Sequence, residues 1–356
     1  MQFTPIQIGR SKCCKRLTIR ALAKTAKNET FHLAIQINDS DLRRQGHVII
    51  ESIMKSRKFY KDIINHCYQR TADNGVLFYT VSDHLVYFTI YCVVAKKYGI
   101  KVLSLCQMPD HIHDAVIAKS QNNLTEFKRE VNSRFAREYN KYCGTKGQVF
   151  EMPFGSAPKY GDKKARSVIV YIGNNPVERL LVTYAEEYRW NYLAYAFCPH
   201  PFSEKIVIRR SSKALRAAVK VVKAEYKAGR PLNYTLIKNM TKELSPSEKQ
   251  QFTDFVISTY NVIDFKAACR FFDTYSNMIA AMHATTGSEH DLNEVFVGKS
   301  DKPYSKMTSI ITSSTNYKDI HQILALDKDA KWQLFLLLRE KTNVMGAQIY
   351  KFLHLG

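Results

Sequence analysis

The alternation of apolar and polar residues predicts two adjacent strands in the first third of the chain. Residues 100–106 are mostly apolar, and a second β-favouring run begins at His111, after a break that contains proline. Side chains alternate between the faces of a strand, so His111 and His113 project from the same side. Ile112 and Asp114 then point the opposite way, toward a core. Two imidazoles on one rigid face are a potential pair of metal ligands, although ordinary histidines also produce so short a pattern.

Apolar residues at three-to-four spacing predict helices around these strands. The strongest pattern predicts a helix over 122–141, with Gly144 as the residue that closes it. Weaker patterns predict a strand over 31–37, a helix over 41–72, a helix over 83–97 capped by Ser82 or Asp83 and closed by Gly99, and a short strand within 149–160. Residues 76–81, before the helix over 83–97, are a short apolar run. Residues before a proline are pushed out of the helical region. A helix over 162–174 should therefore break at Asn175-Pro176, and a second should start at once over 176–187.

The second half of the chain has a mostly helical pattern beyond Pro199-His200-Pro201. Helices are predicted over 211–228, from a capping box at 245–248 to about residue 259, and over 262–283. Two short helices, 330–339 and 346–353, flank a tight turn, which is typical of a helix-turn-helix for duplex DNA or of a plain packing unit. The predicted organisation is a basic arm (1–28), an α+β domain (29–198) and a helical, basic C-terminal region (199–356).

The charge balance favours a polyanionic partner. The chain has 53 Lys and Arg residues against 32 Asp and Glu residues, a net charge of +21. Nucleic acid is the commonest partner of such a surface. A membrane surface is less favoured, because the basic residues are spread along the chain and no lipidation signal is present. We predict that two helical faces contact DNA phosphates. Their cations are Lys128, Arg129, Arg134 and Arg137 on the helix over 122–141, and Lys213, Arg216, Lys220, Lys223 and Lys227 on the helix over 211–228.

Cysteine use and the lack of long apolar segments indicate a cytoplasmic protein. Eight cysteines are scattered without a Cys-x-x-Cys pair, which favours free thiols in a reducing compartment. No run of about 18 apolar residues is present, so no transmembrane helix is expected. Residues 1–15 also lack the apolar core of an export signal.

A second candidate site lies at Tyr171 and Asn175, which are four residues apart and share a face if they are helical. A tyrosine hydroxyl is a potential nucleophile toward phosphorus, and an amide oxygen is a hard donor suited to Mg²⁺ or Mn²⁺. Both residues also have ordinary explanations, since Tyr171 could be a core aromatic and Asn175 could cap the next helix. Tyr139 and Tyr142 are competing nucleophiles, but neither has a metal-binding residue four positions later.

Three features follow one another along the chain: the run Met108-Pro109-Asp110-His111-Ile112-His113, the basic helix, and the run Tyr171-Ile172-x-x-Asn175-Pro176-Val177. In this order they resemble the single-tyrosine HUH transposases, and among these the REP-associated tyrosine transposases, over roughly residues 30–195. The resemblance implies an HUH endonuclease domain, a ferredoxin-like or RRM-like antiparallel sheet flanked by helices, with the histidine pair on a central strand. It also implies binding of single-stranded DNA, usually beside a hairpin, and cleavage that leaves a 5′-phosphotyrosine link and a free 3′-hydroxyl.

The resemblance also implies roles for individual residues. Tyr171 would be the nucleophile, and His111, His113 and Asn175 would hold Mg²⁺ or Mn²⁺. The protein would then be a transposase that cleaves and rejoins DNA in the bacterial nucleoid, with a homodimer left open.

Three departures from the family pattern keep a second hypothesis open. Asp110 stands where asparagine is common, and Asp114 stands where an apolar residue is common. Asp114 would point into the core, which is costly unless it pairs with a cation or the strand ends there. Family members also often end near residue 200 of this numbering, so the C-terminal region is unexplained. The alternative is a catalytically impaired DNA-binding regulator of repeats or hairpins.

Overall fold

The computed structural model describes residues 59–284, 298 and 300–355, all within one compact unit that spans 57–356. The predicted basic arm, the strand predicted over 31–37 and the first part of the helix predicted over 41–72 lie outside these residues. In the described part, no helix is long and apolar enough to span a membrane. Six of the eight cysteines lie there, and none of the six forms a disulfide.

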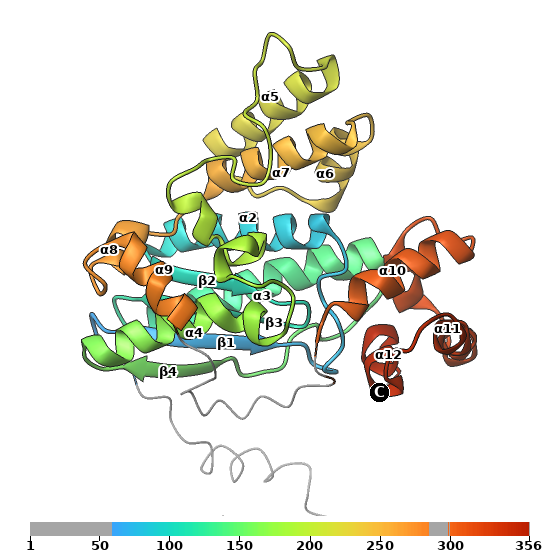
Figure 1. The fold of residues 1–356 in the computed structure, drawn as a ribbon, viewed down its shortest axis with the longest axis horizontal. Helices are drawn as coiled ribbons and strands as arrows, with labels where there is room; N and C mark the ends of the chain where they lie inside the picture. Colours follow the sequence, from blue (N-terminus) through green and yellow to red (C-terminus); the bar gives the residue numbers. More distant parts are fainter. Residues whose placement is uncertain (1–58, 285–297, 299, 356) are drawn as a thin grey trace, which may run out of the picture. The chain divides into compact units, whose positions relative to one another are not determined.

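Four antiparallel strands form the sheet that carries the histidines (Figure 1). They are β1 (Ile64–Arg70), β2 (Lys101–Gln107), β3 (His111–Ile117) and β4 (Gly155–Lys159), in the spatial order β2-β3-β1-β4. β3 is therefore an inner strand between β2 and β1. The strands predicted over 100–106, from His111 and within 149–160 are confirmed.

β1 corrects the helix predicted over 41–72, because residues 64–70 are a strand. Asn65, His66 and Gln69 are buried although they are polar. Helices cover both faces of the sheet, and burial on both faces removes the alternation that marks a half-exposed strand. In the apolar run over 76–81, residues 76–80 form neither strand nor helix, and α2 begins at Val81.

Three helices cover the two faces of the sheet. α2 (Val81–Tyr98) and α3 (Gln121–Cys143) pack on one face, and α4 (Asp162–Glu178) packs on the other. The N-cap of α2 is Thr80, earlier than predicted, because the carboxylate of Asp83 accepts a hydrogen bond from the Thr80 backbone N–H at 2.7 Å. Gly99 ends α2 in the left-handed conformation, as predicted.

The two faces of β3 meet different cores. Ile112 and Val116 belong to the core shared with α2 and α3, whereas Ala115 packs with residues of α4. Strand alternation therefore places His111 and His113 on the α4 face. This is the arrangement expected from the sequence.

Asp114 lies on the opposite face and is fully buried. Its carboxylate forms an ion pair with Lys128 of α3 and accepts a hydrogen bond from the Tyr91 hydroxyl at 2.7 Å. The pairing with a cation meets the condition under which a buried acid is tolerated. Lys128 is 1% exposed, so the prediction that it contacts DNA is wrong: its ammonium group belongs to the core.

α4 continues through Asn175 and Pro176 as far as Glu178, so the predicted break and the second helix over 176–187 are wrong. Pro176 removes one backbone donor, but it lies in the last turn of the helix. Residues 168–176 are all buried, and this packing holds Asn175 in the helical conformation that a following proline disfavours. The segment after α4 forms short 3-10 turns, η1 (Ala185–Glu187), η2 (Arg189–Asn191) and η3 (Leu193–Ala196).

The C-terminal region is helical, as predicted. Its helices are α5 (Lys213–Lys227), α6 (Tyr234–Thr241), α7 (Pro246–Tyr260), α8 (Phe265–Cys269), α9 (Tyr275–Ala284), α10 (Pro303–Ser314), α11 (Lys328–Lys341) and α12 (Gly346–Leu353), with a 3-10 turn η4 (Ile320–Ala325). The single helix predicted over 262–283 is wrong: α8 and α9 are separated by a turn at Asp273, whose φ of 66° is outside the helical range.

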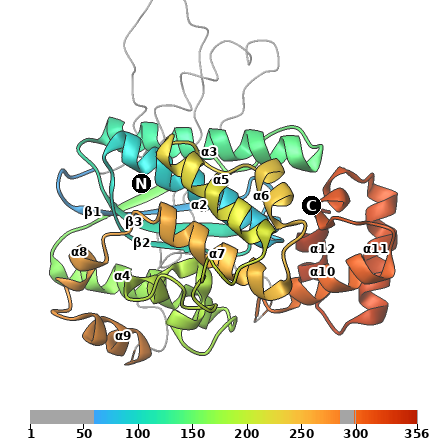
Figure 2. The same cartoon turned by 90° about the horizontal axis from the view of Figure 1, so that it is seen from above.

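The helices of this region share cores with the sheet domain. α5, α6 and α7 contribute to the core of α2 and α3, and α5 crosses above α2 (Figure 2). α10, α11 and α12 form a smaller core that includes Val76. The domain boundary predicted after residue 198 stays a prediction.

A buried ionic network fastens η4 to the sheet domain. The two ring nitrogens of His321 lie 2.8 Å from a carboxylate oxygen of Asp83 and 2.7 Å from one of Asp319. Tyr234 donates to Asp83, and Tyr142 donates to Asp319. Burial alone would lower the pKa of His321, but the two carboxylates raise it to about 10.

Candidate active site

The four residues predicted from the two motifs meet between β3 and α4. His111 and His113 extend from β3, and their ring centroids are 4.9 Å apart. Tyr171 of α4 packs edge-on against His113 at 5.5 Å between centroids. One turn further along α4, the Oδ1 atom of Asn175 lies 3.2 Å from Nε2 of His111.

His66 of β1 is a further member of this cluster that the sequence analysis missed. Its Nε2 lies 3.1 Å from Nδ1 of His113, and its ring centroid lies 5.6 Å from that of Tyr171. The register places Tyr68 opposite His113, so β1 presents His66 and Tyr68 to the same face of the sheet. A strand interpretation of residues 64–70 would have revealed His66 by period-two alternation, but that segment was predicted to be helical.

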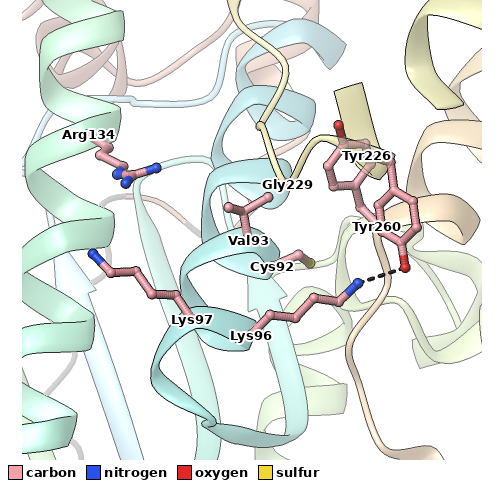
Figure 3. Close-up of a pocket in the computed structure, with 8 residues that line it drawn as sticks. All are labelled: Cys92, Val93, Lys96, Lys97, Arg134, Tyr226, Gly229 and Tyr260. Atoms are coloured by element: carbon pink, nitrogen blue, oxygen red, sulfur yellow. Dashed lines mark hydrogen bonds between the residues drawn. The ribbon is translucent and has the colours of Figure 1, made fainter. Parts of the chain in front are cut away.

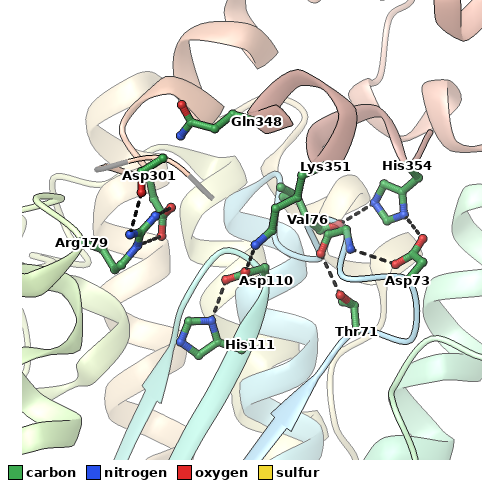
Figure 4. A network of polar contacts seen from close by, with 12 residues as sticks. Thr71, Asp73, Val76, Asp110, His111, Arg179, Asp301, Gln348, Lys351 and His354 are labelled. Carbon is green, nitrogen blue, oxygen red and sulfur yellow. Dashed lines mark hydrogen bonds and ion pairs between the residues drawn. The ribbon is translucent and has the colours of Figure 1, made fainter. Parts of the chain in front are cut away.

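Asp110 orients His111 from the loop between β2 and β3. Its Oδ1 lies 2.6 Å from Nδ1 of His111, and its other oxygen pairs with Lys351 of α12 (Figure 4). Burial would raise the pKa of Asp110, but His111 and Lys351 outweigh it and hold that pKa well below its ordinary value. Asp110 is therefore a carboxylate that accepts the Nδ1 proton of His111, the usual partner of a metal-binding imidazole.

The donor atoms fit a divalent cation. With Nδ1 of His111 donating to Asp110, Nε2 faces Asn175 Oδ1, and a neutral ring would present its lone pair there. Neighbouring ligands of an octahedral cation with bonds near 2.1 Å are roughly 3 Å apart, which is close to the observed 3.2 Å. Nδ2 of Asn175 is buried without a hydrogen-bond partner among the described residues, while Oδ1 faces His111. Among those residues no group of three or more His, Cys, Asp or Glu is arranged to hold a metal, and the candidate set is two imidazoles and one amide.

The cluster is buried. His113 is 1% exposed, Tyr171 5% and His111 6%. A low-dielectric surrounding strengthens the electrostatic interactions of groups inside it.

A family of known proteins matches the segment that contains this cluster. Residues 56–175 match the family model for IS200-like transposases. This segment belongs to the IS200-like transposase family. The match includes His111 and His113 of β3 and Tyr171 and Asn175 of α4.

One solved structure is also similar to part of this chain. It is the structure of a REP-associated tyrosine transposase bound to a REP hairpin, with 16% sequence identity and a TM-score of 0.34, and the similarity covers 39% of this chain and 81% of that chain. No curated protein matches the chain.

The competing tyrosines lie elsewhere in the IS200-like domain. Tyr139 and Tyr142 are on α3, across the sheet from α4. Tyr142 donates to Asp319 and stacks on Tyr234 with centroids 4.2 Å apart. Tyr139 is 4% exposed and lies beside the buried His321 network. Neither packs with the β3 histidines in the way that Tyr171 does.

The remaining predicted DNA-contacting cations are on the surface or at its edge. On α3, Arg129 and Arg137 are exposed, whereas Arg134 is partly buried and pairs with Glu130 at 2.7 Å. Arg129 pairs with Glu126. On α5 all five predicted cations are exposed; they are Lys213, Arg216, Lys220, Lys223 and Lys227. These exposed cations could reach DNA phosphates, and their contact with DNA stays a prediction.

Arg134 also lines a surface pocket formed by α2, α3, α5 and α7 (Figure 3). Lys96 and Lys97 project into it from the end of α2, and Tyr226 and Tyr260 form its other side. Lys96 donates to the Tyr226 hydroxyl at 2.7 Å, while Lys97 pairs with Glu130. Of the predicted DNA-contacting cations, Arg134 lines this pocket, whereas α5 contributes Tyr226 and none of its five predicted cations.

Proposed function

We propose that this protein cleaves and rejoins single-stranded DNA through a 5′-phosphotyrosine intermediate on Tyr171. His111, His113 and Asn175 would hold Mg²⁺ or Mn²⁺ beside the nucleophile. The proposal rests on one observation: residues 58 to 64 positions apart in the sequence bring two imidazoles, an amide oxygen and a phenol into one cluster between β3 and α4. Membership of residues 56–175 in the IS200-like family supports the same reaction class.

In the proposed reaction, the hydroxyl oxygen of Tyr171 attacks a backbone phosphorus, and the bond from phosphorus to the 3′ oxygen of the departing strand breaks. The phenolic proton passes to solvent, and the 3′ oxygen takes up a proton. The products are a 5′-phosphotyrosine link and a free 3′-hydroxyl. A 3′-hydroxyl can attack that link in turn and join strands, because one phosphodiester is exchanged for another. The bound ion would supply positive charge that stabilises the negative charge developing on the phosphate.

The DNA partner would be gripped mainly by lysine and arginine contacts with phosphates. The net charge of +21 and the exposed cations of α5 support this part of the proposal. We extend it to hairpin-flanked, REP-like sites, by analogy with the REP-associated family that the motifs resemble.

The alternative, an impaired DNA-binding regulator, depended on the two acids beside the histidines. Asp114 lies in the core on the far side of β3, where Lys128 and Tyr91 satisfy it. Asp110 hydrogen-bonds His111 in the manner of a supporting carboxylate. Both positions favour the active enzyme over the regulator.

A denaturing-gel assay with labelled single-stranded DNA from the regions flanking the gene tests the proposal. The wild-type protein with Mn²⁺ should give a cleaved strand and a band of protein covalently linked to DNA. Tyr171→Phe should give neither product but bind DNA as the wild type does. Tyr142→Phe is the matched control and should retain the covalent band.

Two further arms test the metal ligands. His111→Ala and addition of EDTA should each abolish cleavage while DNA affinity persists. A covalent band of full yield from Tyr171→Phe, or undiminished cleavage in EDTA, would contradict the proposal.

A further inference from the structure

We propose that Lys351 is a positioning residue for His111, and that helix α12 thereby completes the surroundings of the metal site. The inference rests on the proposed function, because it assigns His111 as a metal ligand. It gives a role to the C-terminal helices, which the match over residues 56–175 leaves out.

The contacts form a continuous series from α12 to His111 (Figure 4), and His111 in turn contacts α4. Lys351 forms an ion pair with Oδ2 of Asp110, and Oδ1 of Asp110 lies 2.6 Å from Nδ1 of His111. Nε2 of the same ring lies 3.2 Å from Asn175. The side chains of Lys351, Asp110 and His111 are 12%, 17% and 7% exposed, so solvent screens these contacts weakly.

Lys351 fixes the orientation of the Asp110 carboxylate. Asp110 follows the β2 strand in a short loop, which the backbone N–H groups of Leu77 and Phe78 hold by donating to Pro109 O at 2.7 and 2.9 Å. The loop is thus anchored, but the carboxylate can still rotate about its side-chain bonds. With Oδ2 held by the ammonium group, Oδ1 faces His111 and sets both the ring plane and the proton position. The ammonium group also offsets the cost of burying the carboxylate.

The same C-terminal segment also reaches α4. Arg179, directly after α4, donates to both carboxylate oxygens of Asp301 at 2.7 and 3.2 Å, and both residues are buried. Asp301 lies just before α10, and Gln348 of α12 donates to Ser300 O at 2.7 Å. The segment therefore contacts both elements that supply the proposed ligands, β3 through Asp110 and α4 through Arg179.

A contact near the same end of α12 provides a matched control. His354 pairs with Asp73 and hydrogen-bonds Val76 O at 2.8 Å, which fastens the helix to the loop after β1 (Figure 4). Within the described residues, His354 contacts Asp73, Val76 and Tyr79 and none of the three histidines of the site. If α12 only needs to be attached, loss of His354 and loss of Lys351 should have similar effects.

The test measures Mn²⁺ affinity of the full chain without DNA, by electron paramagnetic resonance of free Mn²⁺, alongside the thermal unfolding midpoint. Lys351→Met should weaken Mn²⁺ binding about tenfold or more, the usual effect of losing a group that supports a metal ligand. Lys351→Arg should restore most of the affinity, because it returns a cation to Asp110. His354→Gln should leave Mn²⁺ affinity within about twofold of wild type, whatever it does to the unfolding midpoint. The double variant Asp110→Asn with Lys351→Met should bind Mn²⁺ no more weakly than Asp110→Asn alone, because Lys351 acts on His111 through Asp110.

The inference is overturned if Lys351→Met remains folded and binds Mn²⁺ like the wild type, or if His354→Gln weakens binding as much as Lys351→Met. Should Lys351→Met unfold, Asp110→Asn decides the question by the same criterion, because it removes the carboxylate through which Lys351 would act on His111. Wild-type protein that binds Mn²⁺ but forms no Tyr171 adduct would contradict the proposed function and leave the role of Lys351 standing. Wild-type protein that binds no Mn²⁺ would overturn the metal site and the inference together.

Discussion

Replacing Lys128 by methionine should destabilise the protein without changing the surface that is proposed to bind DNA. Lys128 is 1% exposed and Asp114 is fully buried, and their ion pair is supplemented by the Tyr91 hydroxyl at 2.7 Å from Asp114. Lys128→Met would leave the Asp114 carboxylate in the core with a single hydrogen-bond donor. Removing one partner of a buried ion pair costs about 3–5 kcal/mol, because the remaining charge is uncompensated. We expect a loss of this size in the free energy of unfolding.

Two comparisons make the test specific. The double substitution Lys128→Met with Asp114→Leu removes both charges and should recover most of the stability, since replacing a buried pair by apolar residues is often neutral or stabilising. Arg129→Met, at the neighbouring but exposed position of α3, should change stability by less than about 0.5 kcal/mol. Urea unfolding of the full chain, followed by circular dichroism, measures all three.

The reasoning would be refuted by a Lys128→Met protein as stable as Arg129→Met. It would also be refuted if the double substitution were no better than the single one. A fall in DNA affinity of folded Lys128→Met would restore the DNA contact first predicted from the sequence.

Three further results are expected. The pKa of His321 is raised from 6.5 to about 10. Its contribution to stability should therefore be complete below pH 6.5 and decline as the pH rises toward 10. His321→Gln should flatten that decline, as measured by urea unfolding midpoints between pH 6 and 10. Lys220→Ala with Lys223→Ala should weaken single-stranded DNA binding and make its salt dependence shallower, measured by fluorescence anisotropy at several salt concentrations, while an unchanged salt slope would exclude the α5 face. Gly155→Ala should destabilise the fold by about 1–3 kcal/mol, because the added Cβ would lie 1.9 Å from the Tyr68 ring; thermal unfolding at the wild-type midpoint would count against this crowding.

Local patterns were sufficient for much of the fold and for the central site residues. The helical repeat predicted α3 almost to its ends, and strand alternation placed His111 and His113 on one face. The spacing of Tyr171 and Asn175 placed them on one face of a helix, and α4 carries both. These features depend on backbone periodicity, which a short stretch of sequence already specifies.

Local rules failed where packing outweighed them. β1 was missed because both of its faces are buried, so it lacks the apolar and polar alternation of an exposed strand. α4 was expected to stop before Pro176, but burial of its last turns against the sheet holds the helix together. His66 was lost with β1, although it contacts His113.

The sequence by itself determined which residues could do chemistry and which faces they share, because both follow from residue type and from the period of helix and strand. Only the tertiary structure decided which group each charged side chain contacts. Lys128 lies on the polar side of a predicted helix, yet it meets Asp114 across the core. Asp110 and Lys351 are 241 positions apart, yet they form an ion pair beside His111. No local pattern encodes such pairs, because a contact between distant segments exists only once sheet and helices have packed.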